Sequence, residues 1–378
     1  MTDLPHPPLV TGLDVDGAGA HPAAAALSGL DPADLVSGAR LARAVRHAEH
    51  AGLTFVTFAD AALPAVPGSP ASARLDAVTR AAFVARTTTA IGLVPEVPTT
   101  YPEPFHVATQ LASLDLAASG RAGWLAAVTP GDAAPAAYGR APVADLGREA
   151  RDVVQVVRDL WDSWEDDAVI RDVATGRYVD RDRIHRVDFA GESFSVVGPL
   201  ITPRPPQGQP VVLARAGDVA GPGRDGERLV DVVLVGGEDA AGARAAARAV
   251  VDADPGARAV VEVQVVLDAV GRTGADRLAE LDAGPAGPWA AGAALRHVGP
   301  AAGLRALLAE LADDPAVAGV RLLAASLDAD LPALARDVLP ALRADRRTAP
   351  PRSGATLRDH LGLARPANRF AGAARATA

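Results

Sequence analysis

The 378-residue sequence contains no cysteine, a single methionine and only 4% aromatic residues. The absence of cysteine excludes disulfides, thiolate metal sites and cysteine nucleophiles. Because aromatic side chains and methionine are scarce, we expect a core of alanine, valine and leucine. The 8 histidines show no spacing typical of a metal site. We therefore expect no bound metal.

Charge and hydropathy argue against two further classes of protein. The formal net charge is −9, which disfavours a nucleic-acid partner. No apolar run reaches the roughly 18 residues that a membrane-spanning helix needs. The first residues, MTDLPHPPLV, lack the basic and apolar regions of a signal peptide. We expect a cytoplasmic protein that contacts neither nucleic acid nor membrane.

Strand-like and helix-like segments alternate along the chain, which is typical of a parallel α/β fold. Residues 164–209 contain an apolar pattern of period two that predicts a β-hairpin around Ala190 and Gly191. Residues 269–296 have no clear period and are interpreted as an excursion between elements, and residues 345–378 form a tail. No linker or repeat divides the chain, so residues 1–378 are predicted to form one domain. Apolar runs predict strands that begin near Leu9, Leu53, Ala90, Arg121, Pro210, Asp231, Ala259 and Val317.

Polar residues or glycines follow several predicted strands. In a chain of βα repeats, side chains at the carboxyl ends of the strands face a shared active-site mouth. His21 follows the first strand, Asp60 the second and Thr129 the fourth. A solvated loop histidine and a helix N-cap are the simpler interpretations of His21 and Asp60. The glycine-rich segment that includes Gly217 and Gly221 offers backbone N–H groups to a phosphate.

Four stretches resemble signatures of the bacterial-luciferase-like flavin monooxygenases, nearest to the nitrilotriacetate/dibenzothiophene-sulfone monooxygenase branch. They are LASLDLAASGRAGWLAAVT at 111–129, PTTYPEPFHVA at 98–108, the segment 160–210 that begins LWDSWEDDAV, and ATLRDHLGLARPANRF at 355–370. The resemblance covers nearly the whole chain. It implies a TIM-type (β/α)8 barrel in which 164–209 is an insertion.

The resemblance also implies a two-component monooxygenase that oxidises a small organic substrate with O2 through a flavin C4a-peroxide. A separate NAD(P)H-dependent flavin reductase would supply the reduced FMN. The cofactor carries the chemistry in such enzymes, while the protein holds the ring and excludes water. We expect a homodimer or homotetramer. By resemblance His21 is the catalytic residue, and the flavin-binding residues are Asp60, Thr99, Trp124, Thr129, Tyr138, Gly217 and Gly221.

The chain departs from the family pattern at polar positions that would contact the flavin. Leu125 stands in place of an asparagine, Gly147 of a tyrosine and Val219 of a serine, and Asp218 lies beside the expected phosphate. Each lost hydrogen bond removes roughly 0.5–1.5 kcal/mol of binding free energy, so we expect weak FMN binding. Two alternatives stay open. One is a cofactor-poor, non-catalytic barrel that binds a ligand or a partner subunit, and the other is a deazaflavin (F420)-dependent oxidoreductase.

Overall fold

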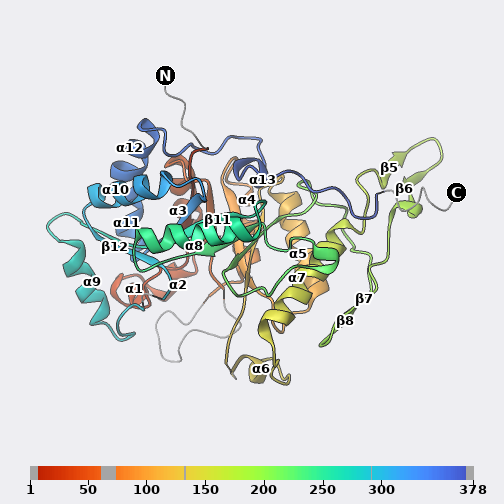
Figure 1. Ribbon diagram of the computed structural model, residues 1–378, viewed down its shortest axis with the longest axis horizontal. Helices are drawn as coiled ribbons and strands as arrows, with labels where there is room; N and C mark the ends of the chain where they lie inside the picture. The colour runs from red at the N-terminus through yellow and green to blue at the C-terminus, as the bar shows by residue number, and fades with distance from the viewer. Residues whose placement is uncertain (1–6, 61–73, 132, 291, 372–378) are drawn as a thin grey trace.

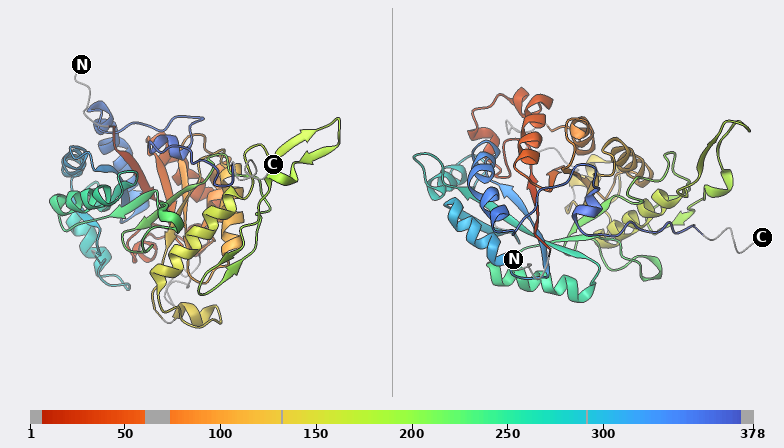
Figure 2. Two further views of the ribbon diagram at one scale, coloured as in Figure 1. Left: turned by 45° about the vertical axis from the view of Figure 1, so that its right-hand side comes forward. Right: turned by 90° about the horizontal axis from the view of Figure 1, so that it is seen from above.

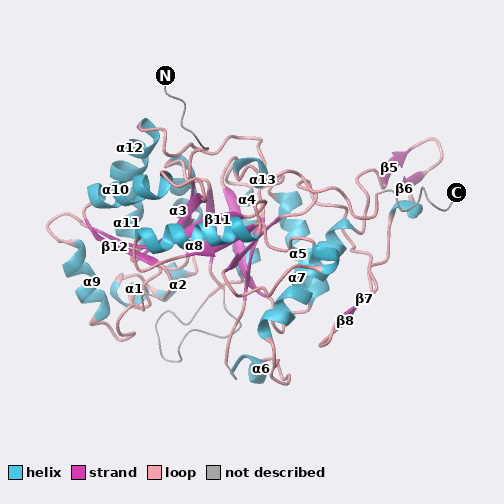
Figure 3. Ribbon diagram, viewed as in Figure 1, coloured by secondary structure: helices cyan, strands magenta, loops and turns pink. Residues whose placement is uncertain are grey.

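The computed structural model describes residues 7–60, 74–131, 133–290 and 292–371. At its centre a closed barrel of parallel strands is surrounded by helices (Figures 1 and 3). The order around the barrel is β1-β2-β3-β4-β9-β10-β11-β13, and β13 pairs with β1 to close it. The predicted TIM-type fold and the predicted barrel strands are confirmed. These strands are β1 (Val10–Asp14), β2 (Phe55–Phe58), β3 (Gly92–Pro98), β4 (Gly123–Ala127), β9 (Val211–Arg215), β10 (Val232–Val235), β11 (Arg258–Leu267) and β13 (Val317–Ala324).

Helices cover the outside of the barrel and bury alanine, valine and leucine against it. Local sequence sets their starts: Glu103 accepts hydrogen bonds from the N–H groups of Phe105 and His106 at the first turn of α5. The longer helices are α3 (Gly38–His50), α4 (Ala77–Ala85), α5 (Pro104–Ala117), α7 (Leu146–Asp162), α8 (Ala240–Ala253), α9 (Gly274–Asp282) and α10 (Ala301–Ala312). The shorter ones are α1 (Ala24–Leu27), α2 (Pro32–Leu35), α6 (Ala133–Ala137), α13 (Leu357–His360), and α11 (Leu327–Ala333) and α12 (Leu339–Ala344), which a π-helical turn joins.

Strand β12 (Leu295–Gly299) and helix α9 are among the elements that the sequence does not predict. The first half of β11 pairs with β10, whereas its second half pairs with β12. The sheet therefore extends beside the barrel at this point. Leu295 is buried but the rest of β12 is only half-buried, so the segment lacks the apolar run by which the other strands are predicted.

The C-terminal tail closes the amino-terminal end of the barrel. Leu357, Leu361 and Leu363 belong to the same apolar cluster as Leu125 and the other inward-facing side chains of the strands. The fit is close, because a Cβ added at Gly92 would lie 2.7 Å from a methyl group of Leu357. This packing gives a physical role to the tail signature and leaves the carboxyl end of the barrel as the open one.

Asp115 of α5 connects the tail to the barrel. Its carboxylate accepts hydrogen bonds from Gln207 Nε2 at 2.6 Å and from the Ala122 N–H at 3.1 Å. Gln207 Oε1 accepts in turn from the Arg358 N–H at 3.0 Å. Burial raises the pKa of Asp115 to about 6, although the hydrogen bonds from Gln207 and Ala122 oppose the shift.

We expect the buried Asp115 to make stability depend on pH. The pKa of Asp115 is 3.8 in the unfolded state and about 6 in the folded state. Between these two pH values the folded state binds more protons than the unfolded state, so the protein loses stability as the pH rises through this range. Relative to Asp115→Asn, which cannot titrate, the parent should lose roughly 2 kcal/mol of unfolding free energy between pH 4.5 and 7.5. Urea unfolding at the two pH values measures this difference. A difference between the two proteins that does not change with pH would contradict the prediction.

Residues 164–209 hold two antiparallel hairpins outside the barrel. The first pairs β5 (Val169–Asp172) with β6 (Arg177–Val179), and in both views of Figure 2 it extends away from the barrel. The second pairs β7 (Phe189–Ala190) with β8 (Ser195–Val196), at the position where the sequence predicts a hairpin. Trp164 Nε1 donates to the Leu200 carbonyl at 2.7 Å and ties the two ends of the segment together.

The assignment of residues 1–378 to one domain stays a proposal, and residues 1–6 and 372–378 lie outside the described residues. Within the ranges that the structure describes, no helix combines the length and the apolar character that crossing a membrane requires.

Candidate functional site

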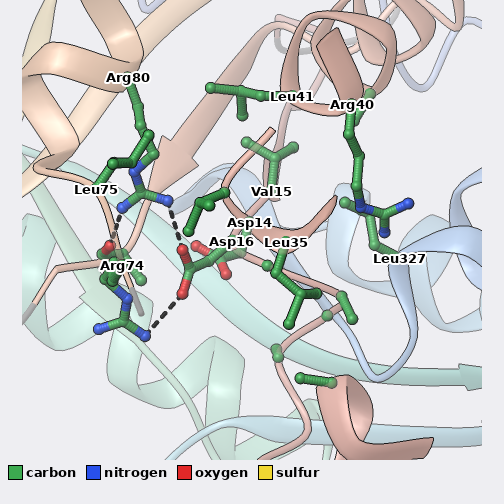
Figure 4. A pocket seen from close by; sticks show the side chains of 18 of the residues that line it. Asp14, Val15, Asp16, Leu35, Arg40, Leu41, Arg74, Leu75, Arg80 and Leu327 are labelled. Carbon is green, nitrogen blue, oxygen red and sulfur yellow. Dashed lines mark hydrogen bonds and ion pairs between the residues drawn. The ribbon is translucent and has the colours of Figure 1, made fainter. Parts of the chain in front are cut away.

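The carboxyl end of the barrel opens into a cavity of about 1120 Å³. This volume exceeds the roughly 300–1,000 Å³ of ordinary small-molecule sites. The cavity walls come from the loop after β1 and from α2, α3, α4 and the start of α11, as the side chains in Figure 4 show. Charged side chains of the barrel strands form the floor. The cavity therefore lies where the carboxyl ends of barrel strands place functional groups.

Arg321 of β13 is the centre of one half of the floor. Its Nη2 donates to Asp14 Oδ1 on β1 at 3.0 Å, and its Nε donates to Thr57 Oγ1 on β2 at 3.0 Å. Its Nη1 bonds Glu262 of β11. The Arg321 side chain is only 2% exposed, so these partners replace the water that the guanidinium loses on burial.

Arg215 of β9 is the centre of the other half. Its Nη1 lies 3.1 Å from Glu96 Oε1 on β3, and its Nε lies 3.7 Å from Glu262 Oε2. Burial by itself lowers the pKa of Arg215, but Glu96 and Glu262 hold it above its ordinary value. Glu262 thus links the two arginines into one network that spans the barrel.

His21 lies in the cavity wall and is buried. The Ala23 N–H donates to Nδ1 at 3.0 Å, so Nδ1 is the acceptor nitrogen and Nε2 donates to Asp282 Oδ1 at 3.0 Å. That hydrogen bond lowers the pKa of Asp282. Both ring nitrogens are therefore engaged, and His21 fixes the loop after β1 against α9. His21 lies at the cavity, as the sequence predicts. Its ring nitrogens bond to Ala23 and Asp282, so it holds these two segments in position.

Asp60 and Tyr138 lie close enough to interact. Asp60 accepts a hydrogen bond from the Ala77 N–H at 2.7 Å, at the start of α4. Tyr138 stacks on Tyr101 with ring centroids 5.6 Å apart. Burial raises the pKa of Tyr138, and the charge of Asp60 adds to the shift. Tyr101 has a φ of 78°, a backbone conformation rare outside glycine.

The remaining predicted flavin residues lie at the ends of β3 and β4 or, in the case of Trp124, within β4. Thr99 is buried and donates from Oγ1 to the Ala127 carbonyl at 3.0 Å, while Thr129 is half-buried in the loop after β4. Trp124 is fully buried on the outer side of the barrel, where its ring meets Trp161 of α7 edge-on, with centroids 6.4 Å apart. Trp124 therefore packs between barrel and helix and does not line the cavity. The inward-facing neighbour is Leu125.

The glycine-rich loop after β9 lies against the first turn of α7. Gly217 and Gly221 have φ values of 91° and 71° and are exposed. The Ala220 N–H donates to the Gly147 carbonyl at 3.2 Å. Asp218 is half-buried, and burial raises its pKa with further contributions from Glu96 and Glu262. Neither Gly217 nor Gly221 is among the described residues that line the cavity.

Comparison with known proteins assigns the chain to a family. The model of the family described as luciferase-like monooxygenase matches residues 18–330. The chain belongs to this family. Nitrilotriacetate monooxygenase component A of Aminobacter aminovorans is 41% identical over 164 residues, which are 42% of this chain and 36% of the relative. Dibenzothiophene-sulfone monooxygenase of Rhodococcus erythropolis is 36% identical over 144 residues, 37% of this chain and 31% of the relative. The predicted family and branch are confirmed.

The luciferase-like chain spans about a third of the length of these two relatives, 36% and 31%. A structural neighbour, EDTA monooxygenase from Chelativorans sp. BNC1, aligns with a TM-score of 0.76 at 23% identity. The alignment covers 95% of this chain and 99% of the neighbour. This similarity supports the barrel fold over nearly the full chain.

The charged floor of this luciferase-like barrel is the part of the site that the sequence does not predict. A signal is present, because Glu96, Glu262 and Arg321 each interrupt an apolar strand. A buried charge is costly unless it is paired, so such interruptions indicate partners on other strands. Among the described residues, no group of three or more His, Asp or Glu side chains is arranged to hold a metal ion.

Proposed function

We propose that this luciferase-like protein is a monooxygenase that uses O2 and reduced FMN to oxidise a small organic molecule. A separate NAD(P)H-dependent flavin reductase would supply the reduced FMN. The observation that carries the proposal is the large cavity at the open end of the barrel, in a chain that matches the family over residues 18–330. The relative from Aminobacter aminovorans is named as component A of a monooxygenase, which supports a separate reductase.

The loop after β9 does not fit the flavin phosphate that the resemblance assigns to it. The hydrogen bond from Ala220 to Gly147 closes the loop onto α7, and a Cβ at Gly147 would lie 3.2 Å from the Ala220 Cβ. A tyrosine at position 147 would therefore crowd Ala220, so the loop would have to shift to make room for it. The Asp218 carboxylate beside it would repel a phosphate dianion. We propose that FMN binds weakly, with its phosphate outside this loop.

In the proposed function the cavity excludes water from the substrate and keeps a fixed shape around it. Leu35, Leu41 and Leu327 stand on its walls (Figure 4) and would exclude water from a bound organic molecule. The ion pairs of the floor network join strands β1, β3, β9, β11 and β13. The hydrogen bond from Arg321 to Thr57 adds β2. We propose that these contacts keep the cavity shaped for its substrate.

The closed loop also favours a second candidate function. A barrel that has lost the phosphate contacts but keeps a cavity is suited to bind a ligand, or a partner subunit, without catalysis. The F420-dependent interpretation meets the same obstacle, since that deazaflavin also carries a phosphate. We further propose a homodimer or homotetramer, supported by Val173 and Tyr178, which are exposed on the β5–β6 hairpin.

Anaerobic flavin titration tests the proposed function. We expect the purified protein to be nearly colourless, and reduced FMN to bind more tightly than oxidised FMN. On addition of O2, NADH and a flavin reductase, a candidate substrate should gain one oxygen atom from O2, which labelling with ¹⁸O2 detects by mass. If FMN, reduced FMN and F420 all fail to bind at millimolar concentration, the monooxygenase proposal fails and the non-catalytic candidate replaces it.

A further inference from the structure

We propose that the cavity at the barrel mouth takes an uncharged, mostly apolar molecule and discriminates against carboxylates and polycarboxylates. The inference deepens the proposed function, on which it rests where it names the bound molecule as the substrate. It follows from the balance of charge around the cavity and from the apolar side chains that the cavity leaves uncovered.

Every arginine that lines the described part of the cavity is already paired with a carboxylate. On the floor, Arg321 pairs with Asp14 and Glu262, and Arg215 pairs with Glu96.

On the wall, Arg74 and Arg80 both pair with Asp16, as the dashed lines of Figure 4 show. Arg40 lies 2.9 Å from Asp328 Oδ1. The five arginines of floor and wall thus face five carboxylates. Residues 61–73, which connect Asp60 to Arg74, include no charged side chain in the sequence. No residue that lines the described part of the cavity therefore offers an anion an unmatched positive charge.

Charge balance disfavours an anionic ligand for a physical reason. A carboxylate that enters an apolar-walled cavity loses its hydration, and it regains that free energy only from a cation that is free to pair with it. Here such a cation must first leave its own carboxylate. On the floor, Asp14 or Glu96 would then stay buried without its arginine. An uncharged molecule meets no such penalty.

The walls favour an apolar molecule. Phe83 of α4 and Leu75 just before it both line the cavity, yet they are 57% and 47% exposed. Large apolar side chains gathered at the rim of a cavity are typical of a binding surface. A ligand that covers them would remove their apolar area from water, which contributes about 25 cal/mol per Å².

The test compares two probes with one ring system and different charge. Binding of 2-naphthalenemethanol and of 2-naphthoate to the full-length protein is measured by calorimetry, without flavin, and nitrilotriacetate serves as a polycarboxylate probe. We expect the alcohol to bind at least about tenfold more tightly than either anion. Equal or tighter binding of 2-naphthoate or nitrilotriacetate would overturn the proposal.

Two variants test the two parts of the argument. Phe83→Ala should weaken binding of the alcohol about three- to tenfold. Leu116 is a leucine of similar exposure that lies on α5 outside the cavity, so Leu116→Ala should not change the binding. Asp328→Asn removes an exposed carboxylate and frees Arg40, so it should tighten 2-naphthoate binding and leave the alcohol unchanged. An unchanged affinity for the alcohol in Phe83→Ala, or for 2-naphthoate in Asp328→Asn, would count against the proposal.

These measurements separate the inference from the proposed function. If the alcohol binds as expected while reduced flavin does not bind, the inference holds and the monooxygenase proposal fails. If reduced flavin binds and a polycarboxylate is oxidised, the proposed function holds and the inference fails.

Discussion

Replacement of Arg321 by methionine is expected to lower the free energy of unfolding by roughly 3–5 kcal/mol. Arg321 is the buried partner of Asp14 and Glu262. Its loss leaves Asp14 in the barrel interior without a counter-charge and leaves Glu262 with only Arg215, whose Nε lies 3.7 Å away. Methionine retains most of the side-chain length, so the loss of charge dominates the loss of volume. Urea unfolding followed by circular dichroism measures the change.

Two further variants make this prediction specific to the buried charge. Arg336→Met removes an arginine that pairs with its neighbour Asp337 on the surface, and it should leave the unfolding midpoint nearly unchanged because solvent screens exposed pairs. Adding Asp14→Asn to Arg321→Met removes the carboxylate that lost its cation and should recover part of the lost stability. Equal midpoints for Arg321→Met and Arg336→Met would show that the floor network does not hold the barrel together.

The double variant Asp218→Asn, Val219→Ser is expected to bind FMN at least about tenfold more tightly than the parent. It removes a half-buried carboxylate beside the predicted phosphate position and supplies a hydroxyl donor. A hydrogen bond to a charged group contributes roughly 1.5–3 kcal/mol, and about 1.4 kcal/mol corresponds to a factor of ten in affinity. Fluorescence quenching of FMN on titration with each protein measures both affinities.

The matched control is Asp225→Asn, which removes an exposed carboxylate from the same loop and should not change FMN affinity. Leu125→Asn, another substitution that restores the family pattern, is less suitable. Leu125 belongs to the apolar cluster inside the barrel, so an asparagine there would bury an amide group. Tight FMN binding by the unmodified chain would contradict the interpretation of Asp218 and Val219 as lost contacts.

The sequence by itself determined the elements and the family. Apolar runs such as Val211–Arg215 and Val317–Ala324 are strands in the structure, because a parallel strand buried on both faces reads as a continuous apolar segment. The position of His21 after the first predicted strand predicts a place at the barrel mouth, and His21 lines the cavity. Asp60 and Tyr138 are not among the described residues that line it. Strand β12 is not predicted from the sequence, because it is mostly half-buried and pairs with only part of β11.

Only the tertiary structure decided what the side chains of those elements meet. Trp124 and Leu125 are neighbours in sequence, but one packs against α7 and the other lies inside the barrel, since successive side chains of a strand point to opposite faces. The pairing of Arg321 with Asp14 joins residues at opposite ends of the chain, and it exists because β13 lies beside β1 when the barrel closes. Charge compensation at the mouth and closure of the loop onto Gly147 likewise depend on distances between segments that local pattern does not contain.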